Sequence, residues 1–113
     1  MKRIALATVL TLAPLAAQAD ITAFCRVLPG TEPAQCACAT EKLRAQVSGS
    51  EVALYDAVTK GYLANRATGQ GWLKAWRAAV AAVAQQNGMP LEALKASLDQ
   101  TGAVHRALGD TCK

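Results

Sequence analysis

The stretch LEALKASLDQTGAVHRALGDTC, residues 91–112, carries the clearest fold signal in the 113-residue chain. Mostly apolar residues recur in it at alternating intervals of three and four, the periodicity of one helix face packed in a bundle. The pattern predicts a long amphipathic helix that needs partner helices to cover its apolar stripe. The stripe consists of Leu91, Leu94, Leu98, Thr101, His105, Leu108 and Cys112.

Three further helices are predicted upstream of this stretch. The first covers about residues 33–47, the second follows an N-terminal cap at Ser48 and ends near residue 65, and the third covers about residues 72–87. Residues 20–30 are predicted to be irregular and to end in the Pro29-Gly30 turn. No run alternates with a period of two for long enough to predict a strand. The sequence therefore predicts an all-α fold, a small disulfide-stapled bundle of about four helices.

The first nineteen residues have the pattern of a signal peptide. Lys2 and Arg3 form a positive start, residues 4–13 are apolar, and Ala17-Gln18-Ala19 places small residues where a signal peptidase cuts. The apolar run is too short for a permanent membrane anchor. We therefore expect a signal peptide over residues 1–19 and a single helical domain over residues 20–113, periplasmic or secreted by a bacterium.

The four cysteines all belong to the expected mature domain, and an even number in a short exported chain predicts two disulfides. A bond between Cys36 and Cys38 would close a strained ring. On a helix these two side chains leave about 200° apart, and Cys112 shares the apolar stripe of the last helix. This phase favours Cys36–Cys112 with Cys25–Cys38, while the pairing Cys25–Cys36 with Cys38–Cys112 remains open.

The Cys36-Ala37-Cys38 motif also permits an alternative function, as a redox pair or as a ligand for a soft metal such as Cu(I) or Zn(II). A metal site usually needs further ligands, and the chain offers only the distant His105 and Met89. There is no Cys-x-x-Cys motif and no strand–helix alternation of the thioredoxin type. The structural role of the cysteines is the favoured interpretation, so no metal or cofactor is expected.

The distribution of charge suggests one candidate surface. No acidic residue lies between Ala57 and Leu91, and an electropositive face of this kind can attract an anionic partner. The formal net charge of +4 includes Lys2 and Arg3 of the signal peptide, so the mature domain is only weakly basic, which argues against nucleic-acid binding. The alternative is a solvated face without a partner. The candidate surface comprises Lys60, Arg66, Trp72, Lys74 and Arg77.

Trp72 and Trp76 lie one helical turn apart beside Lys74 and Arg77. This arrangement is typical of an interfacial amphipathic helix or of an aromatic anchor at a protein interface. The favoured alternative is that both indoles fill the core, because the domain has few other large side chains. Of the two, Trp72 is expected to be the more exposed, since it begins the helix.

No known catalytic motif is present. His105 is the only histidine, and its position on the core stripe predicts a structural imidazole bonded to a backbone carbonyl. A non-enzymatic binding or structural role in the periplasm is favoured over an enzymatic one. The expected partner is another protein or an anionic component of the cell envelope. The sequence leaves the oligomeric state and the identity of the partner open.

Overall fold

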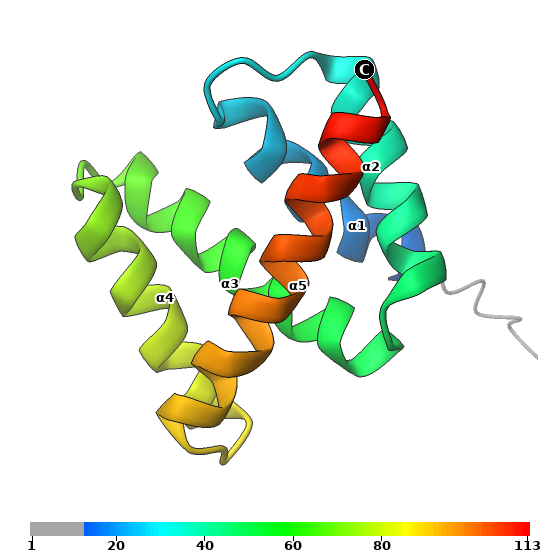
Figure 1. Ribbon diagram of the computed structural model, residues 1–113. Coiled ribbons are helices and arrows are strands. Elements are labelled where there is room, and N and C mark those ends of the chain that lie inside the picture. The colour runs from blue at the N-terminus through cyan, green and yellow to red at the C-terminus, as the bar shows by residue number, and fades with distance from the viewer. Residues whose placement is uncertain (1–12) are drawn as a thin grey trace, which may run out of the picture.

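The computed structural model describes residues 13–113, and all regular secondary structure in that range is helical (Figure 1). This confirms the prediction of a small all-helical fold linked by disulfides. The helices are α1 (Ala13–Val27), α2 (Pro33–Gln46), α3 (Gly49–Ala67), α4 (Trp72–Gln86) and α5 (Leu91–Thr111). The last four match the predicted helices to within about two residues.

Helix α1 corrects the prediction that residues 20–30 are irregular. Phe24 and Cys25 follow Ile21 at three and four residues, so the three side chains share one face of α1. This face packs on the bundle, and Ile21 is fully buried. Residues 1–12 of the expected signal peptide lie outside the described part of the chain. Its remaining residues, 13–19, form the start of α1. The cleavage point after Ala19 therefore falls inside a helix. Across residues 13–113, no helix has the length and hydropathy needed to span a bilayer.

The helices are arranged around α5, which runs across the molecule from its start near α4 to its end beside α2 (Figure 1). Helices α3 and α4 form an antiparallel pair in close contact. A Cβ atom at Gly61 would lie 3.1 Å from the Cβ of Ala79, so the absence of a side chain at Gly61 permits this approach. Helix α1 packs against α2 and α3. The result is a bundle in which α1, α3, α4 and α5 enclose a common space.

The start of α3 follows the predicted cap with one change of detail. The Ser48 hydroxyl oxygen accepts a hydrogen bond from the backbone N–H of Glu51 at 3.3 Å. The Glu51 carboxylate accepts from that same hydroxyl at 3.1 Å, whereas in a capping box it would accept from the Ser48 backbone N–H. The local signal thus placed the helix start correctly.

The disulfides join Cys25 to Cys36 and Cys38 to Cys112, so the favoured pairing is wrong and the one left open is present. Helical phase separated Cys36 from Cys38 correctly. The error came from treating residues 20–30 as irregular, because a helical α1 packs on the Cys36 side of α2. The opposite side of α2, with Cys38, then faces the end of α5.

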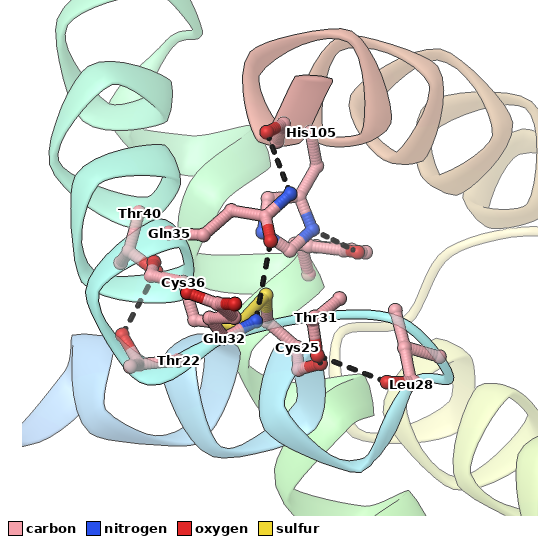
Figure 2. The surroundings of a disulfide bond; sticks show 11 residues. Thr22, Cys25, Leu28, Thr31, Glu32, Gln35, Cys36, Thr40 and His105 are labelled. Atoms are coloured by element: carbon pink, nitrogen blue, oxygen red, sulfur yellow. Dashed lines mark hydrogen bonds between the residues drawn. A yellow bond between two sulfur atoms is a disulfide. The ribbon is translucent and has the colours of Figure 1, made fainter. Parts of the chain in front are cut away.

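Polar contacts surround the Cys25–Cys36 bond (Figure 2). The Thr31 hydroxyl donates to the Cys25 carbonyl oxygen at 2.7 Å, and the hydroxyls of Thr22 and Thr40 are 2.8 Å apart. The Gln35 side-chain amide donates to the Gly109 carbonyl oxygen at 2.7 Å. These bonds tie the α1–α2 hairpin together and fasten α2 to the end of α5.

Candidate functional site

A cavity of about 690 Å³ opens between α1, α3, α4 and α5. Small-molecule sites in proteins typically measure about 300–1,000 Å³ and are mostly apolar with a few placed polar groups. The aliphatic part of the lining fits this description, and Leu91 at its edge is 42% exposed. The aliphatic lining residues are Leu28, Val80, Ala81, Leu91 and Leu98.

Aromatic rings form one continuous side of the cavity. Phe24 of α1 lies at the centre, with ring centroids 5.4 Å from Tyr62, 5.7 Å from Trp76 and 6.2 Å from Tyr55. Tyr62 and Trp76 are also in edge contact at 5.9 Å. Such edge and offset contacts stabilise aromatic clusters beyond the area they bury. The rings therefore make a firm apolar surface within the cavity.

A buried polar pair, Tyr55 and His105, also lines the cavity. The Tyr55 hydroxyl lies 2.9 Å from His105 Nδ1, so the histidine partner is a side chain and the predicted backbone carbonyl is wrong. Burial, and secondarily the nearby Arg106 charge, lowers the pKa of His105. Burial raises the pKa of Tyr55 to about 12, against a smaller opposing effect of Arg106. Both groups are therefore neutral near pH 7.

The charged groups at the cavity are mainly basic. Arg77 comes from α4, and Lys95 and Arg106 come from α5, against one carboxylate, Asp99. Arg106 has no ion-pair partner within residues 13–113, whereas Lys95 pairs with Glu92 at 3.5 Å. A Cβ atom at Gly102 would lie 3.7 Å from Arg106 Nη1, so the guanidinium extends back along α5 over this glycine. An unpaired cation thus lies at the apolar cavity.

The structure divides the candidate surface predicted from charge. Trp72 and Arg77 line the cavity. Lys60, Arg66 and Lys74 are exposed and are not part of the lining, and Arg66 donates a hydrogen bond to the Gln70 carbonyl oxygen at 2.9 Å. Whether the exposed three contact a partner stays a prediction.

The two tryptophans have different environments. Trp76 is half-buried and packs in the aromatic cluster. Trp72 is 66% exposed at the start of α4, so the interpretation that both indoles fill the core is wrong for Trp72. The expected order of exposure is confirmed, because the first turn of α4 projects beyond the helices that cover Trp76. Trp72 thus lies at the edge of the cavity.

Several cavity residues were missed from the sequence. Phe24 was assigned to an irregular segment, although its spacing from Ile21 and Cys25 is helical. Lys95 and Arg106 do not belong to the acid-free stretch that defined the candidate surface, because α5 also carries acids. Their spacing of eleven from each other places them on one face of α5 with Gly102. That spacing was the available signal.

All four cysteines are in disulfides, and Cys36 and Cys38 are bonded to different helices. Redox or soft-metal chemistry at Cys36-Ala37-Cys38 would first require both bonds to be reduced. Within the part of the chain that the structure covers, no group of three or more His, Cys, Asp or Glu side chains is placed to hold a metal ion.

The cavity therefore combines an apolar interior, an aromatic side and basic groups, as small-molecule sites in proteins commonly do. Comparison with protein-family models, with curated proteins and with solved structures gives no match to this chain. The function must be argued from the cavity itself.

Proposed function

We propose that this chain is an exported, non-enzymatic binding protein that takes up an apolar ligand in the cavity between α1, α3, α4 and α5. The observation that carries this proposal is the cavity of about 690 Å³ with its aromatic side. The cavity is open to solvent, with Trp72 66% and Leu91 42% exposed, so apolar surface in it contacts water. Uptake of an apolar ligand would remove that surface from water, which favours binding.

Export is the second part of the proposal. It is supported by the order of basic start, apolar run and Ala17-Gln18-Ala19, and by two disulfides, which persist mainly in oxidising compartments. The periplasm or the exterior is therefore the proposed location. Intact mass of the protein recovered outside the cytoplasm is expected to correspond to residues 20–113. A mass that retains Lys2 and Arg3 would contradict cleavage.

Ligand uptake can be tested by filling the cavity. Ala81 lines it from α4, and the adjacent Ala82 is exposed on the same helix outside the lining. We expect isothermal titration calorimetry to show saturable 1:1 binding of a dodecyl-chain amphiphile below its critical micelle concentration. Ala81→Trp should weaken this binding at least tenfold, whereas Ala82→Trp should leave it unchanged. Equal effects of the two variants would place the binding site elsewhere.

The exposed basic residues give a further control. If a protein or an anionic envelope component instead binds the predicted basic surface, Lys74→Glu should lower the association rate of that partner. The difference in rate between Lys74→Glu and the unchanged protein should become smaller as the salt concentration rises. On the cavity proposal, Lys74→Glu should leave binding of the amphiphile unchanged, because Lys74 does not line the cavity. The two candidate sites thus give opposite results for one substitution.

A further inference from the structure

We infer that the cavity selects single-chain amphiphiles with an anionic head group, whose head is held by Arg106 and whose chain lies against the aromatic side. This inference rests on the proposed function, and it adds the chemical class of the ligand. Its basis is the charge of the lining together with the position of one guanidinium.

Arg106 is placed as an anion anchor by two independent observations. Its Nη1 atom lies over Gly102, where a Cβ atom would be 3.7 Å away. It lines the same cavity as Tyr55 and His105, and its charge lowers the pKa of both groups. The guanidinium therefore sits near the buried polar pair and has no carboxylate partner in the described range, 13–113. Guanidinium groups bind phosphate and carboxylate oxygens through paired hydrogen bonds.

The other charged groups favour the same class of ligand. Arg77 and Lys95 add positive charge from the two helices that flank the cavity. Glu92 pairs with Lys95, and Asp99 is the one carboxylate in the lining, so a net positive charge remains. This charge would repel a cationic head group, give a neutral one no attraction and attract an anionic one. The apolar and aromatic lining excludes a ligand that is only an anion. A single alkyl chain with an anionic head satisfies both parts of the site.

The test compares head groups on one chain length. Dodecyl phosphate, dodecyl maltoside and dodecyltrimethylammonium are titrated by calorimetry into the exported protein below their micelle concentrations. We expect dodecyl phosphate to bind at least tenfold more tightly than the other two. Arg106→Gln should abolish that preference, so that dodecyl phosphate binds no more tightly than dodecyl maltoside. The matched control Arg44→Gln, at an exposed residue of α2 outside the cavity, should have no effect.

The outcomes separate this inference from the proposed function. Equal affinity for all three head groups, insensitive to Arg106→Gln, would overturn the anion anchor while leaving uptake of an apolar ligand intact. Absence of binding by every amphiphile would overturn both. Adsorption to phosphatidylglycerol vesicles that persists in Ala81→Trp would also overturn the inference, because it would show a membrane surface, not a single chain, as the ligand.

A second inference concerns Asp56 on α3. This residue is 8% exposed, and its Oδ1 atom has no hydrogen-bond partner within the described part of the chain. An unsatisfied buried carboxyl oxygen is costly and calls for a partner. Ile21 of α1 is fully buried in the same core cluster as Tyr55 and Val58, which flank Asp56 on α3. The Asp20 charge and the Ile21 backbone N–H are also among the groups that shift the pKa of Asp56. Asp56 is therefore close to the residue that becomes the amino terminus if cleavage follows Ala19.

We propose that the α-ammonium group created by cleavage forms an ion pair with Asp56. Hydrolysis of the Ala19–Asp20 peptide bond adds one water, leaving a carboxylate on Ala19 and an ammonium on Asp20. Adjacent backbone nitrogens are about 3 Å apart, so this ammonium arises beside the backbone nitrogen of Ile21, on the part of α1 that packs against α3. The new cation also offsets the repulsion between the Asp20 and Asp56 carboxylates. In the uncleaved chain, the Lys60 charge opposes this repulsion only weakly. Removal of the signal peptide would thus stabilise the mature domain.

The prediction is tested by titrating Asp56 with carboxyl ¹³C NMR. In the uncleaved chain, burial first and then the Asp20 charge raise the pKa of Asp56 to about 6, against smaller opposing effects of Ile21 and Lys60. In the cleaved protein we expect its pKa to fall below the ordinary value of about 3.9. The uncleaved reference is the full chain carrying Ala19→Tyr, which places a large side chain where the peptidase requires a small one.

Two further results decide this second inference. Asp56→Asn should lower the melting temperature of the cleaved protein and leave that of the uncleaved chain nearly unchanged. Identical Asp56 titration in both forms would overturn the ion pair. Failure of cleavage itself is recognised separately by mass, and would contradict the proposed export instead.

Discussion

At the residue scale, the Tyr55–His105 pair links the core to the cavity, because both side chains are buried and both line it. The Nδ1 atom of His105 depends on the Tyr55 hydroxyl, while its Nε2 atom has no hydrogen-bond partner among residues 13–113. A histidine that lost its one bond would retain two unsatisfied buried nitrogens. The hydroxyl of Tyr55 is therefore expected to matter more for stability than that of the neighbouring Tyr62.

Tyr55→Phe should destabilise the domain by about 1–3 kcal/mol, because it leaves His105 Nδ1 buried without a partner. Tyr62→Phe is the matched control, since Tyr62 is half-buried in the same aromatic cluster. It should change the free energy of unfolding by less than about 0.5 kcal/mol. Urea unfolding monitored by circular dichroism measures both. Equal losses in the two variants would show that the Tyr55–His105 bond contributes nothing specific.

The ionisation of His105 should oppose folding in mild acid. Because burial lowers the pKa of the folded imidazole, the unfolded chain takes up a proton near pH 6.5 while the folded chain does not. The contribution of His105 to stability is thus complete above about pH 6.5 and declines as the pH falls towards the folded pKa. Since His105 is the only histidine, its ring resonances are unambiguous in an NMR titration.

We expect that titration to give a midpoint below 6.5 in the native protein. Stability is best compared between pH 7.5 and 5.5 in the Asp56→Asn background. In the uncleaved chain Asp56 has the opposite effect on stability. Because the pKa of the folded Asp56 is raised to about 6, the stability that it contributes declines as the pH rises through about 4–6. A native imidazole midpoint at or above 6.5 would contradict the burial argument.

At the element scale, the close contact of α3 with α4 holds the aromatic side of the cavity in place. Tyr55 and Tyr62 lie on α3 and Trp76 lies on α4, and the two helices approach at Gly61 and Ala79. A change of spacing between these helices would therefore separate the rings. Gly61 is thus a point at which the backbones of α3 and α4 come close to each other.

Gly61→Leu should destabilise the domain by about 1–3 kcal/mol, because a side chain there must displace Ala79 or push α4 away. Ala64→Leu, at an exposed position on the same helix, is the control and should be nearly neutral. Unfolding in urea gives both values, and near-ultraviolet circular dichroism reports on the aromatic packing. A neutral Gly61→Leu would mean that the α3–α4 contact is loose.

At the scale of the whole molecule, the two disulfides constrain the chain unequally. The Cys38–Cys112 bond spans 74 residues of sequence and the Cys25–Cys36 bond spans 11. On the chain-entropy account, the longer loop restricts the unfolded chain more strongly. The bond between α2 and the end of α5 should therefore be the more important one for stability.

Replacing Cys38 and Cys112 by serine should cost about 4–5 kcal/mol, and replacing Cys25 and Cys36 about 3 kcal/mol, by the loop-length relation. Urea unfolding of the two double variants measures the difference, and peptide mapping without reduction first confirms the pairing in each. The opposite ranking would show that local packing around Cys36, which is fully buried, outweighs the restriction of the unfolded chain.

The sequence by itself determined the helical class and the limits of α2 to α5, because these follow from local periodicity and from caps such as Ser48. It also determined that His105 faces inward and that two disulfides form. These properties depend on residues close together in the chain. Local periodicity also contains the signal for α1, because Phe24 and Cys25 follow Ile21 at three and four residues.

Only the tertiary structure decided which cysteines pair, which partner His105 has, and where the cavity lies. Each of these depends on contacts between helices far apart in sequence, as in Tyr55 with His105 or Cys38 with Cys112. Helical phase gives the direction in which a side chain leaves its own helix, but it does not give the helix that it meets. For the same reason, the placement of Arg106 beside rings from α1, α3 and α4 was out of reach of the sequence, because it required all four helices to be packed.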